Sequence, residues 1–381
     1  MEKDICINSK VDFIGLRALN SNFIEKKIPL LTKQLKDWES TKPLANLRIL
    51  HILVNSYETI IKLEPLLLSG ADVTVVGYDL LKLPNQDEID SKIKELNIKF
   101  IENLPDASGE YDYVLDCGAR ALEIKDLTVL KGIVELTQSG SEKYKTSSLH
   151  QNIPIVSIDS CLVKEFEGIY GTGESFVRAI EQLSGKKLEV NSKFFVFGFG
   201  KIGRGICINL TKKGVSKDNI CIITYSSKRF GEIAELGYSR CFSIENQLTE
   251  IKAEIQKGGF CAVTATGAKG FLEKCFDAGD FSNINYLCNM GNEDEFGSEF
   301  SSKAKNISVS FAINFLLKQP TLMKFLDPTF YCHNQAIELI EQGATFSKGF
   351  NAYPNDECIS CLKYWQEEMK DEENITEFLK N

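Results

Sequence analysis

The glycines at 198, 200 and 203 constrain the fold of this chain more than any other feature. They follow the apolar run Lys193 to Phe197, and their G-x-G-x-x-G spacing is typical of a strand-to-helix turn that binds a dinucleotide. The first glycine permits a tight turn, the second lets the backbone approach a pyrophosphate, and the third lets helix and strand pack closely. A helix beginning near Lys201 would direct the positive end of its dipole at the phosphates. The turn predicts cofactor contacts from Gly198, Gly200, Lys201, Ile202 and Gly203.

The segments around this turn have the pattern of a β-α-β unit. Ile202 to Leu210 has helical spacing, and Asn219 to Thr224 is the next buried strand. The alternative is a glycine turn that serves packing alone. Further strands are predicted near 194–197, 260–264, 285–289 and 307–310.

The N-terminal half predicts a second α/β unit. Its strands are expected at 47–54, 72–77, 111–116 and 153–158, with a helix over 59–69. Asp116 and Asp159 follow two of these strands, so they are candidates for a cleft at the strand ends, and helix capping is the alternative for each. The expected domains are 1–170, 171–325 and 326–352, with a hinge near Glu167 to Glu174 and a solvated helical tail over 353–381.

Composition excludes several classes of protein. At 381 residues and 43% apolar, the chain predicts two ordinary globular domains, and a formal charge of -9 argues against a nucleic-acid partner. No apolar run is long enough to span a membrane, and the N-terminus lacks a signal-peptide pattern. The twelve cysteines look scattered singly as small buried hydrophobes, which predicts a reduced, cytoplasmic protein. Cys358 and Cys361 form the one Cys-x-x-Cys of the chain. Because there is no second such pair and only three histidines could add ligands, no metal is expected. His51 is expected in the core.

The residues after the second strand of the dinucleotide unit favour NADP(H) over NAD(H). An acid at this position would bind the ribose of NAD, but the sequence continues Tyr225-Ser226-Ser227-Lys228-Arg229. The two hydroxyls and two cations are suited to a 2′-phosphate, because charge-assisted hydrogen bonds are stronger than neutral ones. The alternative is that Lys228 and Arg229 are simply solvated.

Several motifs resemble those of the S-adenosylhomocysteine hydrolase family up to about residue 355. Ser40 to Leu44 is similar to the family's entry to the substrate domain, and the run from Asp159-Ser160 through Phe166 and Tyr170-Gly171 to Glu174-Ser175 matches without a gap. Further similar motifs are Thr264-Ala265-Thr266-Gly267, Cys288-Asn289-Met290-Gly291 and Asp327-Pro328-Thr329-Phe330.

The resemblance implies an α/β fold of two domains, in which a Rossmann-type NAD(P)-binding domain is inserted in a second α/β substrate domain. Family enzymes keep a tightly bound NAD, oxidise a ribose hydroxyl, eliminate or add homocysteine, and reduce the ketone again. The resemblance implies cofactor contacts from Thr264, Thr266, Gly267, Asn289, Thr146 and Ser147. It implies substrate contacts from Ser56, Glu58, Cys117 and Asp327.

The positions that carry the family's chemistry differ in this chain. The resemblance places its lysine at Val163 and its histidines at Val54, Asn292 and Asp327. Each positioned proton-transfer group is worth about 10² to 10⁴ in rate, so S-adenosylhomocysteine hydrolysis is not expected. The family's C-terminal extension is also missing, which makes its tetramer doubtful and leaves a homodimer compatible with the sequence.

What remains favours an NADP-dependent oxidoreductase that acts on a small polar metabolite at a C–O or C–N centre. Tyr144 is a candidate proton donor whose pKa a nearby Lys145 ammonium would lower. Glu167 and Asp116 are the other candidate catalytic residues, and an ordinary loop tyrosine is the alternative for Tyr144. The competing hypothesis is a non-catalytic, dinucleotide-binding regulatory relative of the family.

Overall fold

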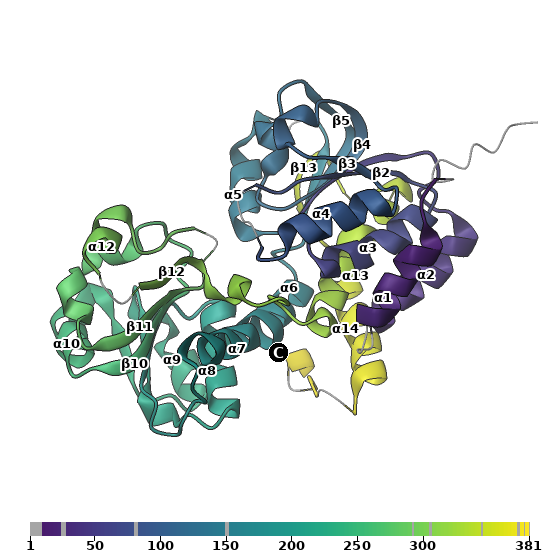
Figure 1. Cartoon of the computed structure of the whole chain (residues 1–381). Coiled ribbons are helices and arrows are strands. Elements are labelled where there is room, and N and C mark those ends of the chain that lie inside the picture. The colour runs from purple at the N-terminus through teal and green to yellow at the C-terminus, as the bar shows by residue number, and fades with distance from the viewer. Residues whose placement is uncertain are drawn as a thin grey trace, which may run out of the picture. The chain divides into compact units, whose positions relative to one another are not determined.

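The chain folds into two compact units, each built on a parallel sheet (Figure 1). The computed structural model describes residues 10–23, 28–79, 83–148, 152–291, 293–304, 307–343, 346–371, 374–376 and 378–380. The first unit contains the chain up to Glu167 and again from Met323 onward, and the second contains Gly168–Leu322. The chain passes from the first unit to the second through a π-helix, η4 (Glu167–Thr172).

The second unit is a doubly wound sheet in the order β12-β11-β10-β7-β8-β9, with every pair parallel. Its strands are β7 (Phe194–Phe197), β8 (Ile220–Thr224), β9 (Cys241–Ser243), β10 (Gly259–Thr264), β11 (Ile284–Asn289) and β12 (Ile307–Ala312). Its helices are α7 (Gly173–Ser184), α8 (Lys201–Lys212), α9 (Phe230–Glu235), α10 (Ile244–Gln256), α11 (Phe271–Cys275) and α12 (Ser298–Lys303). The strand order reverses between β7 and β10, where open α/β sheets bind their ligands.

Every side chain of β7 is apolar and buried, because both faces of the strand are covered. Phe194 and Val196 belong to the core on the α7 and α8 side, which includes Phe176 and Ile206. Phe195 and Phe197 belong to a separate core cluster with residues of α10 and α11. A parallel strand covered by helices on both faces buries every side chain, so the run is apolar throughout.

The first unit repeats the same winding in the order β13-β6-β5-β4-β1-β2-β3. Its strands are β1 (Arg48–Ile52), β2 (Asp72–Val76), β3 (Lys99–Ile101), β4 (Gly109–Asp116), β5 (Leu127–Glu135), β6 (Pro154–Ser157) and β13 (Gly349–Ala352). Its helices are α1 (Phe13–Phe23), α2 (Pro29–Thr41), α3 (Tyr57–Leu68), α4 (Gln86–Glu95), α5 (Gln138–Thr146), α6 (Leu162–Phe166), α13 (Met323–Glu341) and α14 (Asn355–Met369). β13 pairs with β6, so the return segment adds a strand to the sheet that the N-terminal part forms.

The predicted α/β class is confirmed, and the structure adds strands that the sequence did not indicate. β3, β9 and β13 are only three or four residues long, and their identity as strands comes from their pairing. β5 was also missed, because exposed and half-buried residues alternate along its first half.

The C-terminal segment was wrongly expected to be a solvated tail. α14 buries Cys358, Leu362 and Trp365 against the first unit. The Trp365 indole N–H donates to the carbonyl oxygen of Lys324 at 3.0 Å, and its ring meets Phe166 with centroids 4.9 Å apart. The acidic residues drew attention in the sequence, but the apolar face of the helix decides its position.

The cysteines were wrongly expected to be scattered singly. Those in the described ranges are free thiols, but Cys161, Cys332, Cys358 and Cys361 gather inside the first unit. A search of the same ranges finds no group of three or more His, Cys, Asp or Glu side chains arranged to hold a metal ion. None of the helices described is both long and apolar enough to cross a membrane.

Candidate functional site

The glycine turn joins β7 to α8 at the point where the strand order of the second unit reverses. Gly198 has a φ of +96°, and a Cβ there would lie 2.3 Å from the carbonyl oxygen of Ala265. A Cβ at Gly203 would lie 2.1 Å from the carbonyl oxygen of Gly198. Packing within the unit therefore requires glycine at the first and third positions of the motif.

Gly200 differs from the other two glycines because no residue that the structure describes fills the space beside it. A Cβ there would meet no heavy atom within 4 Å, and Gly200 is the N-cap of α8 without a side-chain cap. The N-terminal amides of a helix have no intrahelical acceptor, and an anion is a favoured partner for them. The turn therefore fits a dinucleotide pyrophosphate in both shape and charge.

The predicted 2′-phosphate residues lie at the end of β8, beside this turn. Ser227, Lys228 and Arg229 form a short 3-10 helix and are exposed, while Ser226 is half-buried. The Arg229 guanidinium donates to the carbonyl oxygen of Phe199, within the glycine turn, and to Glu232 Oε2 at 3.0 Å. Within the described part of the chain Lys228 forms no ion pair, and Tyr225 is largely exposed. The structure thus brings one predicted cation to the turn and leaves the other in solvent.

The other expected cofactor residues of this unit are bonded within the protein. The Thr264 hydroxyl donates to Asn289 Oδ1 at 3.3 Å, which ties the ends of β10 and β11 together. The amides of Thr266 and Gly267 donate to the Glu295 carboxylate at 2.9 and 2.6 Å. Glu295 is buried, and burial raises its pKa. Sequence reasoning missed Glu295, because only the fold brings it to this loop.

In the first unit, Asp116 and Tyr144 form a buried pair. The Tyr144 hydroxyl donates to Asp116 Oδ2 at 2.5 Å, and the amides of Cys117, Arg120 and Ala121 also donate to this carboxylate. Burial raises the pKa of both side chains. Lys145 instead pairs with Glu142 at 2.7 Å and lies over the Phe350 ring. The expectation that Lys145 lowers the pKa of Tyr144 is therefore wrong.

Glu135 is a second buried carboxylate at this edge of the sheet. Its oxygens accept from the amides of Gly118, Ala119 and Thr137 at 2.7 to 3.0 Å. Burial and the nearby Asp116 charge raise the pKa of Glu135 to about 7. Glu135 is the last residue of β5, just as Asp116 is the last residue of β4. Had β5 been predicted, this acid at a strand end would have marked Glu135 as a candidate site residue.

Asp327 was expected to contact substrate, but its carboxylate is bonded within the fold. It is fully buried in α13, and its two oxygens accept from the amides of Leu30 and Leu31 at 3.0 and 2.9 Å. These amides belong to the first turn of α2, so Asp327 caps that helix from a distant part of the chain. Burial raises its pKa to about 7.

The remaining predicted residues of this unit lie near helix ends. The Ser56 hydroxyl accepts from the Thr59 amide as the cap of α3, and Glu58 is buried in the first turn of that helix. Burial raises the pKa of Cys117, after β4, to about 12. Thr146 and Ser147 close α5 with hydroxyls that donate to carbonyl oxygens of the same helix. Asn292 lies outside the described residues.

Lys164 is the candidate functional residue that sequence reasoning missed. It follows Val163 in α6, and its ammonium donates to Glu167 Oε1 at 2.7 Å. The side chains of Lys164 and Glu167 are only 17% and 8% exposed. Burial and the Glu135 charge raise the pKa of Cys117, which the Lys164 charge only partly offsets. The Glu167 and Asp159 carboxylates favour the charged form of Lys164 against its burial. An amine, a carboxylate and a thiol thus share the edge formed by the ends of β4 and β6.

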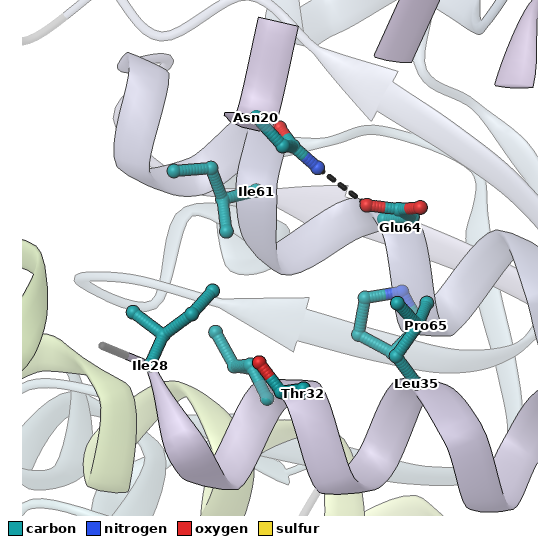
Figure 2. A pocket seen from close by; sticks show the side chains of 8 residues that line it. Asn20, Ile28, Thr32, Leu35, Ile61, Glu64 and Pro65 are labelled. Atoms are coloured by element: carbon teal, nitrogen blue, oxygen red, sulfur yellow. Dashed lines mark hydrogen bonds between the residues drawn. The ribbon is translucent and has the colours of Figure 1, made fainter. Parts of the chain in front are cut away.

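A small apolar cavity lies away from these residues. It lies among α1, α2 and α3 and is lined by residues including Ile28, Leu35 and Ile61, with the Asn20 amide hydrogen-bonded to Glu64 at its rim (Figure 2). Its volume of about 70 Å³ is far too small for a dinucleotide. We assign this cavity no function.

Comparisons with known proteins identify the relatives of the chain. No family model matches it. It is 24% identical over 314 residues to S-inosyl-L-homocysteine hydrolase of Methanococcus maripaludis, covering 75% of this chain and 72% of that one. It is 26% identical to adenosylhomocysteinase of Aeropyrum pernix, covering 52% of each chain, and 24% identical to S-inosyl-L-homocysteine hydrolase of Methanosarcina mazei. The chain is a divergent relative of the adenosylhomocysteinases.

The match to the family is partial in length. The chain spans about half of the Methanosarcina mazei and Aeropyrum pernix relatives. Among solved structures, a dipicolinate synthase chain from Bacillus halodurans has the same fold, with a TM-score of 0.50 at 11% identity over 78% of this chain and 99% of that one. The chain has the glycine turn, and it buries Val163 where the resemblance expects a lysine.

Proposed function

We propose that this adenosylhomocysteinase-family chain is an NADP-dependent oxidoreductase that acts on a small polar metabolite at a C–O or C–N centre. The observation that carries the proposal is Gly200, with open space at the N-terminus of α8, between two glycines that packing demands. A dinucleotide pyrophosphate fills that space and accepts from the first amides of α8. Bound NADP(H) supplies or accepts the hydride.

Three residues beside the turn, Ser227, Lys228 and Arg229, support the choice of NADP(H). Arg229 already lies against the turn through its bond to Phe199, and Lys228 and Ser227 are exposed next to it. Glu232 pairs with both Arg229 and Arg204, so a 2′-phosphate would compete with Glu232 for the Arg229 guanidinium. A doubly charged phosphate competes better than a single carboxylate.

Lys164 is the group of the first unit that is best suited to move a proton. Tyr144 is buried and donates to Asp116, so we place the acid/base role on Lys164 instead. The Lys164 ammonium can donate a proton to a carbonyl oxygen or to an imine nitrogen. The Glu167 carboxylate accepts a hydrogen bond from this ammonium and so orients it. Cys117 and Asp159 complete the polar surface that a small hydroxyl- or amine-bearing substrate would meet.

The cofactor proposal is tested by titrating the purified full chain with NADPH and NADH. The variant Lys228→Ala/Arg229→Ala should weaken NADPH binding at least about tenfold, since each charge-assisted bond contributes about 1.5 to 3 kcal/mol before solvent screening, and should leave NADH unchanged. Lys186→Ala/Lys187→Ala is the matched control, because it removes two adjacent exposed cations elsewhere in the same unit. A preference for NADH, or equal effects of the two double variants, would contradict 2′-phosphate recognition.

A non-catalytic dinucleotide-binding regulator is the second candidate. It is favoured by the internal bonding of the expected reactive groups, since Asp116, Tyr144 and Asp327 are buried and hydrogen-bonded within the fold. A screen of metabolite extracts for a change in nicotinamide absorbance separates the two. Turnover that Lys164→Ala abolishes while NADPH binding persists supports the oxidoreductase. Binding of NADPH without turnover on any extract supports the regulator.

A further inference from the structure

Glu295 is a fully buried carboxylate that lies against the loop after β10. Within the described ranges it forms no ion pair, and its printed partners are all neutral hydrogen-bond donors. A buried charge is costly unless hydrogen bonds satisfy it, so the position of Glu295 depends on these donors. The same bonds in turn fix the segment of chain that supplies them.

Both oxygens of Glu295 hold this loop. Oε1 accepts from the Gly267 amide at 2.6 Å, and Oε2 accepts from the amide and the hydroxyl of Thr266 at 2.9 and 2.8 Å. The carboxylate also requires a glycine at 291, because a Cβ there would lie 2.2 Å from Oε1. The carboxylate and the loop are therefore fitted to each other.

The loop borders the glycine turn at the point where the strand order reverses. The Ala265 amide donates to the Phe197 carbonyl oxygen at 2.8 Å, and the Ala265 carbonyl oxygen is the atom that a Cβ at Gly198 would meet. Gly267 is exposed with a φ of +72°, and a Cβ there would meet no described heavy atom within 4 Å, as at Gly200. The loop thus contacts the turn and, like the turn, presents an open glycine.

The hydrogen bonds of the loop decide what it offers to a ligand. The amides of Thr266 and Gly267 donate to Glu295, and the Ala268 amide donates to the Thr266 hydroxyl at 3.1 Å. Because these donors are used and a negative charge lies behind them, the loop is unsuited to a phosphate. Its backbone carbonyl oxygens are acceptors, and they suit ligand groups that donate, such as ribose hydroxyls and a carboxamide N–H.

The sheet order divides a dinucleotide between two halves. In the order β9-β8-β7-β10-β11-β12, each half binds one nucleotide across the switch point, and the half with the glycine turn and the end of β8 binds the adenosine nucleotide. The loop after β10 belongs to the other half. It therefore serves the nicotinamide riboside, whose hydroxyls and carboxamide are hydrogen-bond donors.

We propose that Glu295 is a positioning residue of the cofactor site, whose carboxylate holds the loop after β10 in the shape that binds the nicotinamide riboside and excludes phosphate. The inference rests on the dinucleotide binding proposed above. Glu295 acts through the amides of Thr266 and Gly267, and the glycine turn keeps its shape without it. Loss of one carboxylate oxygen should therefore weaken binding of the nicotinamide half and spare the adenosine half.

The variant Glu295→Gln tests this separation. Glutamine is of similar size but has one acceptor and one donor, so its N–H must face a donor of the loop. The full chain is titrated with NADPH and with adenosine 2′,5′-bisphosphate, which is the adenosine half alone. The Kd for NADPH should rise at least about tenfold, because a buried donor is left unpaired, and the Kd for the bisphosphate should change by less than about twofold. Glu293→Gln removes the same charge from an exposed side chain two residues away and should change neither Kd.

Two outcomes of the titrations overturn the role of Glu295. Equal weakening of both ligands would show that the variant merely loosens the second unit, and unchanged NADPH binding would show that the loop does not need the carboxylate. A wild-type preference for NADH contradicts the NADP(H) choice alone, because the same comparison with NADH and 5′-AMP then tests Glu295.

Hydrogen exchange on the unmodified chain keeps the proposal falsifiable if the variant does not fold. Before any cofactor is added, the amides of Thr266 and Gly267 should exchange at least about a hundredfold more slowly than unstructured amides, because Glu295 already holds them. Unprotected amides at these two positions would overturn the proposal.

Discussion

The Asp327 carboxylate should make the first unit less stable as the pH rises through neutrality. Its folded pKa is about 7, against an ordinary value of 3.8, because burial disfavours the charge more than the amides of Leu30 and Leu31 favour it. The folded state therefore binds more protons than the unfolded state between pH 3.8 and about 7, and the free energy of unfolding falls as the pH rises through that window.

The variant Asp327→Asn isolates this effect. From pH 5.5 up to its pKa of about 7, a span of about 1.5 pH units, the folded carboxyl holds a proton that the unfolded one has lost. At 1.36 kcal/mol per unit, the free energy of unfolding therefore falls by about 2 kcal/mol between pH 5.5 and 8.5. The stability of the wild type relative to the variant should fall by that amount across the range. The variant also loses one hydrogen bond to α2, but that cost does not depend on pH.

Tryptophan fluorescence in urea measures the first unit alone, because the two tryptophans of the chain, Trp38 and Trp365, lie in α2 and α14. Asp37→Asn, an exposed carboxylate of α2, is the control and should leave the pH dependence unchanged. Glu135 and Asp116 titrate in both proteins and cancel in the comparison. A wild-type advantage that stays constant, or grows with pH, would refute the argument that desolvation outweighs the two amide bonds.

Two further predictions concern the glycine turn and the core. Gly203→Ala places a methyl group 2.1 Å from the Gly198 carbonyl oxygen, and in circular-dichroism melts it should destabilise the second unit by about 1 to 3 kcal/mol. Gly200→Ala should leave the stability of this unit nearly unchanged but weaken dinucleotide binding. Equal stability losses would contradict the separate roles assigned to these glycines. Lys62 is fully buried, its amine lies 3.2 Å from His51 Nε2, and burial lowers its pKa. The unfolded protein therefore binds more protons than the folded protein, and the free-energy cost of burying Lys62 grows as the pH falls below the ordinary lysine range. Lys62→Met should raise the free energy of unfolding at pH 7 by about 1 to 3 kcal/mol, and a destabilised variant would show that the Lys62 contact with His51 is favourable overall.

The features predicted correctly from the sequence depend on short, continuous stretches of chain. The β7 run, the glycine turn and α8 follow one another within twenty residues, and each has a local cause: burial on both faces, backbone shape and helical spacing. The resemblance to the adenosylhomocysteinase family was likewise carried by contiguous motifs, and the relatives confirm it. Strands as short as β3 and β13 carry too few residues to show a pattern, so only their pairing defines them.

The sequence by itself determined the α/β class, the position of the glycine turn between β7 and α8, and the resemblance to the adenosylhomocysteinases. The tertiary structure alone decided which polar side chains are free to act, because their partners are distant in the chain. Asp327 caps α2 from almost 300 residues away, and Tyr144 is held by Asp116. Lys164 and Glu167 are likewise paired and largely buried only in the folded chain. Burial and hydrogen bonding set the charge of each of these groups, and both are properties of the folded neighbourhood.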